Sequence, residues 1–269
     1  MAKPQPSGRH PNRILAALPD ADFGRLAPHL RSVRFETHAI LADPVTTIRN
    51  VYFPRDAVAS MLATMEDGSS VEVATVGNEG MIGLPVFLGT ETMPVDVLVQ
   101  IPGEVSVLDE TVFLAAAQNG GALLNLVHRY TQALLGQIAQ AGACSRLHSV
   151  DRRCARWLLM SHDRVNGDEF LITHESLSQM LGVRRATVTE AASVLQMARL
   201  IACRRGRIRI VDRGGLEEAS CECYGAIRSE YERLIGRPDF PDPDKAVPSG
   251  ATSPFPILHG QATHSPRSG

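Results

Sequence analysis

The stretch EFLITHESLSQMLGVRRATVTEAASVLQMARLIACRRGRIRIVD, residues 169–212, decides the fold of the C-terminal part of this chain. Thr173 stands before an apolar run and predicts a helix start, because its hydroxyl can bond free backbone amides. Gly182 predicts a tight turn after that helix, since glycine adopts positive φ at little steric cost. Two helices joined by such a turn form a helix-turn-helix, whose second helix enters the major groove of DNA. The buried positions expected on the two helices are Leu177, Leu181, Val183, Val188, Ala192 and Leu195.

The second helix, expected over about 184–197, opens with side chains that suit a base edge or a phosphate. Arginine can donate two hydrogen bonds to guanine, and glutamate can accept one from the cytosine amino group. Two β runs over 201–211 enclose a basic turn, which predicts a wing whose arginines reach the phosphate backbone. The candidate DNA-binding residues are Thr173, His174, Arg184, Arg185, Thr187, Thr189, Glu190, Arg204, Arg205 and Arg207.

Positive charge is concentrated in this region. The net charge of the whole chain is −2, yet residues 150–212 carry 11 arginines against 7 acidic side chains, a local net of +4. Such asymmetry fits a DNA-binding module inside a nearly neutral protein. A solvated surface would explain the charge equally well, so the prediction depends on the helix pair, the arginines and the hairpin together.

The N-terminal half is predicted to be a small β domain. Strands without intervening helices favour an antiparallel β-barrel or roll. Helical spacing of apolar residues over 20–30 predicts one short helix before the strands, and Asp-Gly at the centre of 66–69 predicts a turn between two of them. The apolar runs that predict strands are 50–53, 57–65, 71–76, 95–101 and 104–108.

A long helix is predicted from about Gly121 to His148, roughly 40 Å at 1.5 Å per residue. Its apolar stripe fits either a helix packed along its own β domain or a dimer seam. Small residues over 136–143 favour the seam, because they allow close approach of a second helix. The residues expected at the dimer seam are Leu123, Val127, Tyr130, Leu134, Ile138 and Ala141.

Composition excludes several classes of protein. With 44% hydrophobic and 21% charged residues, the chain has the balance of an ordinary soluble protein. It has no apolar run long enough for a membrane span, and its start lacks the pattern of a secretory signal. Five cysteines without framework spacing indicate reduced thiols in a cytoplasm. Residues 1–12 are expected to form a flexible arm, and residues 237–269 a disordered tail.

The order of β-roll, long helix and winged helix over about residues 13–235 resembles the bacterial Crp/Fnr superfamily of transcription regulators. The ending Cys221-x-Cys223-Tyr224 resembles one branch of that family. The resemblance implies that the long helix pairs two subunits and that each second helix reads one half of a palindromic site. It places Arg185 at the guanine-reading arginine and Thr187 at a phosphate-contacting threonine. The operator of the best-known members does not carry over, because their glutamate and arginine are replaced by Ala186 and Glu190.

The resemblance also implies where a cyclic nucleotide would bind. Members that bind one hold its phosphate with a Gly-Glu pair and then an Arg-Ser pair. Gly83 is kept here, but Leu84 stands at the glutamate, and Pro94 and Val95 stand at the arginine and serine. A phosphate without its arginine would be an unpaired anion in an apolar pocket. Cyclic AMP is therefore not expected to bind in the usual way.

No cofactor or metal is expected, and the effector is unknown. The first cysteine is Cys144, so the N-terminal cysteine cluster of oxygen-sensing relatives is missing. Cys221 and Cys223 alone are a poor zinc site, which normally needs four ligands, and metal binding or oxidation sensing is the less favoured alternative. The methionines that fit core filling better than a pocket for an apolar effector are Met61, Met65 and Met81.

We therefore expect an α+β fold: a cyclic-nucleotide-binding-like antiparallel β-roll (jelly roll) at 13–118, a dimerisation helix at 119–148 and a winged helix-turn-helix at 149–236. The expected function is a cytoplasmic, homodimeric, sequence-specific transcription regulator and not an enzyme. Its expected partners are double-stranded DNA, a second copy, RNA polymerase and an unidentified small effector, with no membrane. A cupin-type metalloenzyme would need clustered histidines, but residues 31–110 hold only His38. The remaining alternative is a ligand-binding or scaffold protein whose winged helix makes protein contacts.

Overall fold

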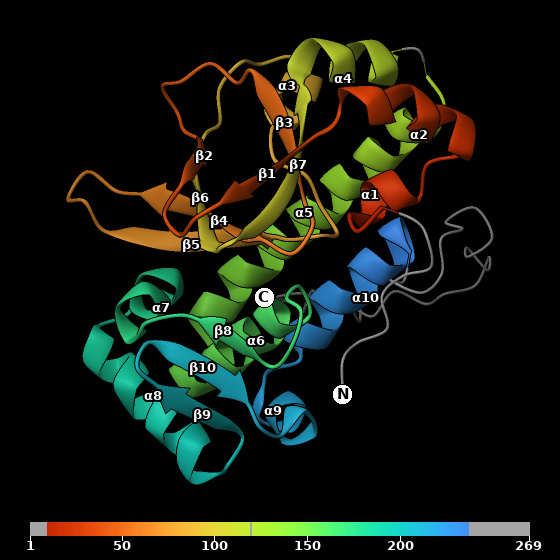
Figure 1. The fold of residues 1–269 in the computed structure, drawn as a ribbon. Coiled ribbons are helices and arrows are strands. Elements are labelled where there is room, and N and C mark those ends of the chain that lie inside the picture. The colour runs from red at the N-terminus through yellow and green to blue at the C-terminus, as the bar shows by residue number, and fades with distance from the viewer. Residues whose placement is uncertain (1–9, 119, 237–269) are drawn as a thin grey trace, which may run out of the picture.

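The structure, a computed structural model, describes residues 10–118 and 120–236. A β-roll and a smaller, mainly helical domain lie against one long helix (Figure 1). The tail expected at 237–269 lies outside the described residues, as do residues 1–9 of the expected arm. Residues 10–12 of that arm are packed rather than loose, because Asn12 is fully buried and its side chain caps the first helix.

The β-roll consists of two antiparallel sheets, with strand orders β1-β7-β3 and β2-β6-β4-β5. Alternate residues face the core, as in β3, where Val51 and Phe53 are both 0% exposed. The turn between β4 and β5 forms at the predicted Asp-Gly pair, with Gly68 at φ 81°. All predicted strands are confirmed, and β1 and β2 are additional. The strands are β1 (Arg31–Phe35), β2 (Ile40–Ala42), β3 (Asn50–Pro54), β4 (Val58–Thr64), β5 (Ser70–Val76), β6 (Asp96–Ile101) and β7 (Gly103–Asp109).

Short helices pack around the roll (Figure 1). The predicted helix over 20–30 is confirmed as α2 followed by one 3-10 turn, whereas α1, α3 and α4 were not predicted. Phe113 and Ala117 of α4 are fully buried, so α4 contributes to the core of the roll. These helices are α1 (Arg13–Ala16), α2 (Asp20–Leu26), η1 (Ala27–His29), α3 (Leu84–Phe87) and α4 (Glu110–Gln118).

The long helix α5 (Ala122–Leu147) connects the roll to the smaller domain, and α10 (Cys223–Ile235) packs along it (Figure 1). Tyr130, in the N-terminal half of α5, donates its hydroxyl hydrogen to the carbonyl of Met81 at 2.8 Å. None of the helices in the described ranges is both long and apolar enough to cross a membrane.

The stripe of α5 that we predicted as a dimer seam is buried within the single chain. Leu123, Val127, Tyr130 and Leu134 are at most 6% exposed, and Ile138 and Ala141 are half-buried. This face packs on the chain's own elements, as the alternative interpretation had it. A periodic apolar stripe does not reveal which surface covers it, and at these four buried positions the cover is the chain itself. Contact of the half-buried Ile138 and Ala141 with a second copy stays a prediction.

The smaller domain is a winged helix with the antiparallel sheet order β8-β10-β9. The residues predicted to be buried on its helix pair are at most 3% exposed, except Val183, which is half-buried. Its elements are α6 (Val150–His162), β8 (Glu169–Leu171), α7 (His174–Leu181), α8 (Arg185–Met197), β9 (Ile201–Arg204), β10 (Arg207–Ile210) and α9 (Arg213–Ala219).

Buried polar contacts join the roll to the winged domain. Arg164 donates hydrogen bonds of 2.8–3.1 Å to both carboxylate oxygens of Glu79, and both residues are at most 7% exposed. Gly77 leaves room for this arginine, since a Cβ there would lie 2.4 Å from Arg164 Cδ. Trp157 Nε1 donates to Glu72 at 2.9 Å. The winged domain is thus fixed against the roll by charge-assisted bonds as well as by apolar packing.

Candidate nucleic-acid interface

The helix-turn-helix is built as the sequence predicted. Thr173 Oγ1 accepts the amide of Ser176 at 3.0 Å and caps α7. Gly182 ends α7 in the left-handed region at φ 61°, and Arg184 is the extended residue before α8. The turn therefore sets the direction of α8 before any partner binds.

The first two turns of α8 present polar side chains to solvent. Arg184, Arg185, Thr189 and Glu190 are exposed, and Thr187 is half-buried. Arg185 Nε lies 3.9 Å from Glu175 Oε2, and the two side chains are 71% and 63% exposed. An exposed ion pair of that length holds the guanidinium only weakly, so it leaves Arg185 available for another acceptor.

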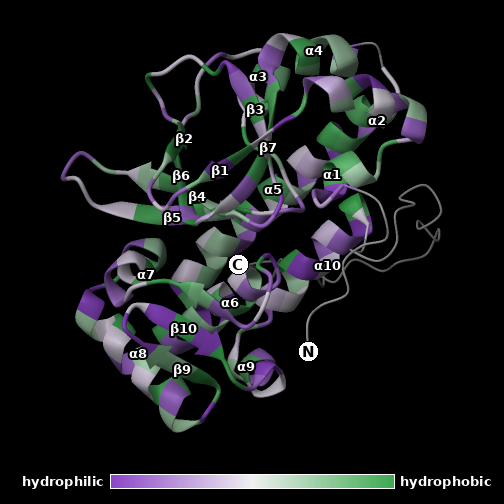
Figure 2. Ribbon diagram, in the orientation of Figure 1, coloured by the Kyte–Doolittle hydropathy of each residue, from purple (hydrophilic) through white to green (hydrophobic). Residues whose placement is uncertain are grey.

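The start of α7, the start of α8 and the tip of the wing adjoin one another. His174 Nδ1 lies 3.1 Å from Thr189 Oγ1, which joins the two helices. The carbonyl of Gly206, at the wing tip, accepts the amide of Ile172 at 2.9 Å. All candidate DNA-binding residues lie on these three adjoining elements, and Figure 2 shows hydrophilic colour on α8 and β10.

The wing is a two-residue β-hairpin. Arg205 and Gly206 both have positive φ, 48° and 75°, which matches the right-handed twist of the flanking strands. Arginine alternates with isoleucine along β10, so Ile208 is buried while its neighbours are exposed. This alternation identifies Arg209 as a further exposed cation of the wing. Sequence reasoning missed it, although the Arg-Ile-Arg-Ile pattern carried the signal.

Three of the arginines counted in the basic segment do not face solvent. Arg153, Arg156 and Arg164 are 8%, 8% and 7% exposed. The charge available to an external anion is therefore smaller than the sequence total. Most of it lies at the start of α8 and on the wing, and the other exposed arginines of the segment are Arg152 on α6 and Arg199 after α8. A charge count cannot separate the two groups, because burial depends on contacts with the roll.

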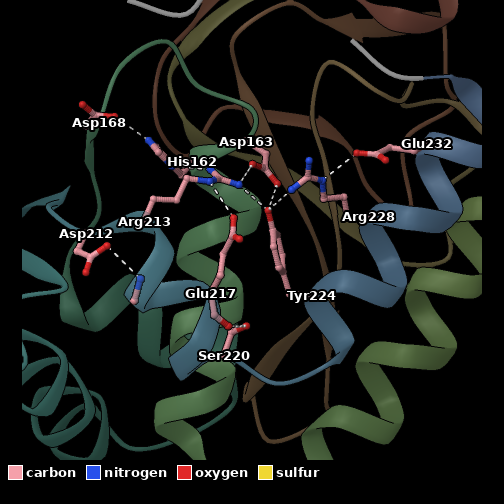
Figure 3. Close-up of polar contacts among 11 residues, drawn as sticks. His162, Asp163, Asp168, Asp212, Arg213, Glu217, Ser220, Tyr224, Arg228 and Glu232 are labelled. Carbon is pink, nitrogen blue, oxygen red and sulfur yellow. Dashed lines mark hydrogen bonds and ion pairs between the residues drawn. The ribbon is translucent and has the colours of Figure 1, made fainter. Parts of the chain in front are cut away.

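A polar network fixes the C-terminal helices to the end of α6 (Figure 3). Arg213 donates to Asp163 Oδ1 and to the Tyr224 hydroxyl, both at 2.6 Å. Tyr224 in turn donates to Asp163 Oδ2 at 2.9 Å. Burial, together with the Asp163 charge, raises the pKa of Tyr224 to about 12. The tyrosine of the Cys-x-Cys-Tyr ending is thus a structural hydrogen-bonding residue.

The segment that would hold a cyclic phosphate carries apolar residues at the positions of the relatives' glutamate, arginine and serine. Gly83 has φ 102° and precedes α3, but the next residue, Leu84, is only 8% exposed. Pro94 is exposed and Val95 half-buried. Two of the three methionines are core residues as expected, whereas the third is exposed; their exposures are 7% for Met61, 1% for Met81 and 53% for Met65.

Comparison with protein-family models finds the Crp-like helix-turn-helix domain over residues 152–219. The chain carries a Crp-like helix-turn-helix domain. The matched segment covers α6 through α9, so the Crp-like domain includes every candidate DNA-binding residue on α7, α8 and the wing. A search of curated protein sequences gives no significant match.

Solved structures with a similar fold include a regulator of the Crp/Fnr family. FixK2 from Bradyrhizobium japonicum has a TM-score of 0.61 at 14% identity, covering 71% of this chain and 98% of that one. A protein from Eubacterium rectale, described as a transcriptional regulator of the Crp/Fnr family, has a TM-score of 0.58 at 16% identity, with coverages of 75% and 94%. CLP of Xanthomonas campestris, a c-di-GMP-responsive global regulator, has a TM-score of 0.56 at 15% identity, with coverages of 71% and 99%. The roll, the long helix and the Crp-like domain are therefore arranged as in Crp/Fnr regulators.

Proposed function

We propose that the chain is a homodimeric, sequence-specific DNA-binding transcription regulator that acts by binding and not by catalysis. The observation that supports this most is the exposed arginines on adjoining elements of the Crp-like domain. In this proposal α8 lies in the major groove, where Arg185 and Glu190 reach base edges. Thr173, His174, Thr187 and the wing arginines contact phosphates, which set position and register.

The second copy pairs along the outer face of α5. Leu135 is 58% exposed, and Ala139 and Gly142 follow it at helical spacing and are exposed. A Cβ at Gly142 would meet no atom within 4 Å, so a second helix can approach closely there. A two-fold pairing on this face presents two copies of α8 to half-sites about 34 Å apart, one turn of B-DNA.

An input to the roll would act through the joint between α5 and α6. The long helix ends at Leu147 and α6 begins at Val150, so the change of direction takes two residues. Such an input would act on two conformations of the dimer that differ in the distance between the two α8 helices. A signal shifts the balance between these conformations only if it binds them with different affinity. Cyclic AMP does not bind in the usual way in this proposal, because Leu84 replaces the expected carboxylate. RNA polymerase is the further partner, and the cytoplasm is the site of action.

The test begins by selecting duplexes from a random pool with the full chain, followed by binding curves at several salt concentrations. Arg185→Ala should relax selectivity at one symmetric pair of positions, with a loss of about 1–3 kcal/mol per bidentate contact. Arg205→Ala should weaken all sequences alike and reduce the slope of log affinity against log salt by about 1. Arg34→Ala, which removes an exposed arginine of β1, is the matched control and should bind as the unaltered chain does.

Failure to enrich any sequence, with no salt-dependent binding, would refute the assignment and favour protein contacts for the winged helix. Dimerisation has a separate readout in sedimentation. Leu135→Glu should give monomers and lose affinity for the palindrome, whereas Val127→Ala should keep the dimer and change only stability. A monomeric unaltered chain at micromolar concentration would refute the pairing.

A further inference from the structure

Four metal-ligating side chains meet where α5 ends and α10 begins. Cys144 lies in the last turn of α5, and His148 follows it by four residues, just after the helix. Cys221 lies between α9 and α10, and Cys223 is the first residue of α10. One donor atom from each of these residues lies within 4.8 Å of the others. Residues some 77 positions apart in the sequence thus form a single cluster.

The separations within this Cys144/His148/Cys221/Cys223 cluster fit one tetrahedral ion. Zinc bonds of about 2.3 Å to sulfur and 2.0–2.1 Å to nitrogen imply about 3.8 Å between two sulfurs, and about 3.6 Å between a sulfur and a nitrogen. The Sγ atoms of Cys144 and Cys221 are 3.5 Å apart, and Cys223 Sγ is 3.5 Å from His148 Nδ1. Both distances are within about 0.3 Å of the edges of that tetrahedron. All five cysteines of the chain are free thiols.

The imidazole is held in the orientation that a metal ligand needs. His148 Nε2 lies 3.1 Å from Glu222 Oε1, while Nδ1 faces the sulfur of Cys223. A carboxylate on the outer nitrogen fixes the tautomer that presents the other nitrogen's lone pair to a metal. Gln140 Nε2 donates to Cys223 Sγ at 3.0 Å, so this sulfur has an outer hydrogen-bond donor. The cluster therefore has outer hydrogen bonds as well as ligands.

Burial and charge around the cluster also suit a thiolate-rich site. The three cysteines are 0–2% exposed, so water has little access to the sulfurs. Three thiolates and one divalent ion leave a net charge of −1. Arg153 and Arg156 of α6 both interact electrostatically with Cys144 and offset this charge.

We propose that Cys144, His148, Cys221 and Cys223 bind one Zn²⁺ in a closed structural site. A set of three thiolates and one imidazole is typical of structural zinc, and four protein ligands leave no position open for catalysis. The site joins the end of α5 to the segment between α9 and α10, and so anchors the Crp-like domain to the long helix. Sequence analysis predicted no metal because it found only the Cys221 and Cys223 pair. The other two ligands come from a distant helix.

The first experiment measures the metal in the full chain, purified without a metal-affinity tag under reducing conditions. We expect one zinc per chain by elemental mass spectrometry. Replacement by Co²⁺ should give the intense visible bands of tetrahedral cobalt and a near-ultraviolet sulfur-to-cobalt charge-transfer band. These measurements use the unaltered protein, so they do not depend on whether a variant folds.

Variants then assign the ligands. Cys221→Ser should lose the zinc, whereas Cys203→Ser, on β9 outside the cluster, should keep it. His148→Cys should retain one metal and change the cobalt spectrum to that of four thiolates. Glu222→Gln should weaken zinc affinity by about 10–100-fold, as the loss of an outer-shell partner does.

Three results would overturn the proposal. One is a folded, reduced chain that contains no zinc and takes up none on titration. Another is an octahedral cobalt spectrum without the charge-transfer band. The third is a disulfide between Cys144 and Cys221 in protein purified without oxygen, because that bond would remove two of the ligands.

Discussion

We expect the contact between the roll and the winged domain to weaken as pH rises towards 7, because Glu72 loses its proton there. Replacing Glu72 with glutamine should abolish this pH dependence. The Glu72 carboxylate accepts hydrogen bonds from Trp157 Nε1 at 2.9 Å and from Ser60 Oγ at 2.5 Å. Part of this residue reaches solvent, but its carboxyl group lies among densely packed atoms. Burial raises the pKa of Glu72 to about 7, although Arg156 and Arg164 act in the opposite direction.

The direction in which pH changes the free energy of unfolding follows from proton binding to Glu72. In the unfolded chain this carboxyl loses its proton near its ordinary pKa of 4.5, whereas in the folded chain it keeps the proton up to about pH 7. The folded state thus binds more protons between these values, and the free energy of unfolding falls as pH rises through that window. At 1.36 kcal/mol per pH unit the loss has an upper limit of about 3.4 kcal/mol. Contact with solvent reduces the expected loss to about 1–3 kcal/mol.

Trp157 is the only tryptophan of the chain and is hydrogen-bonded to Glu72, so its fluorescence reports on this site. We expect its emission to change with a midpoint near pH 7 in the unaltered protein and to stay constant in Glu72→Gln. At pH 8 the variant should be the more stable by about 1–3 kcal/mol in denaturant unfolding, and at pH 5 the two should agree. Glu66→Gln, in the exposed turn between β4 and β5, should behave as the unaltered chain. An identical pH response in Glu72→Gln and the unaltered protein would refute the reasoning.

Further changes test other parts of the fold. Arg164→Met should lower stability by about 3–5 kcal/mol in denaturant unfolding, since it leaves the Glu79 charge buried and unpaired. The double variant with Glu79→Leu should regain most of that loss, and additive losses would contradict a direct pairing. Gly182→Ala should cost more than Gly68→Ala by thermal unfolding, because both have positive φ but only the former Cβ would meet a side chain, at 2.9 Å. Thr173→Ala should cost about 1 kcal/mol through the lost cap of α7, and an unchanged melting temperature would show that the cap is dispensable.

Sequence reasoning succeeded where a local pattern determines structure. Gly182 between two amphipathic helices and the Arg205-Gly206 pair between two β runs each specify a turn through backbone conformation alone. The helix-turn-helix and the wing could therefore be predicted with their boundaries nearly correct. Most strands of the roll were predicted from short apolar runs, which are also a local pattern. The missed strand β1 carries mainly exposed polar residues, so its apolar period is weak. The missed strand β2 has only three residues, all apolar, which is too short a run to show a period.

It failed where function depends on contacts between distant segments. Glu79 and Arg164 are separated by 85 positions, and nothing near either residue shows that the other will neutralise it. The same limit hid the pairing of Cys144 with Cys221. The stripe on α5 was assigned to a second copy because periodicity identifies a buried face but not what buries it. Leu135, next to the buried Leu134 in the sequence, is exposed, and the sequence pattern does not separate the two.

If the chain binds DNA as proposed, the buried bonds between the roll and the Crp-like domain affect the free energy of that binding. Arg164, Trp157 and the contact of α7 with β5 hold the domain in one orientation before any duplex arrives. A DNA-binding domain that is already held in its bound orientation loses little conformational entropy on binding. More of the free energy of its contacts with DNA therefore appears as affinity. The fixed orientation would also make a dimer selective for the distance between the two half-sites of its DNA. Half-sites too far apart could be reached only if these bonds broke.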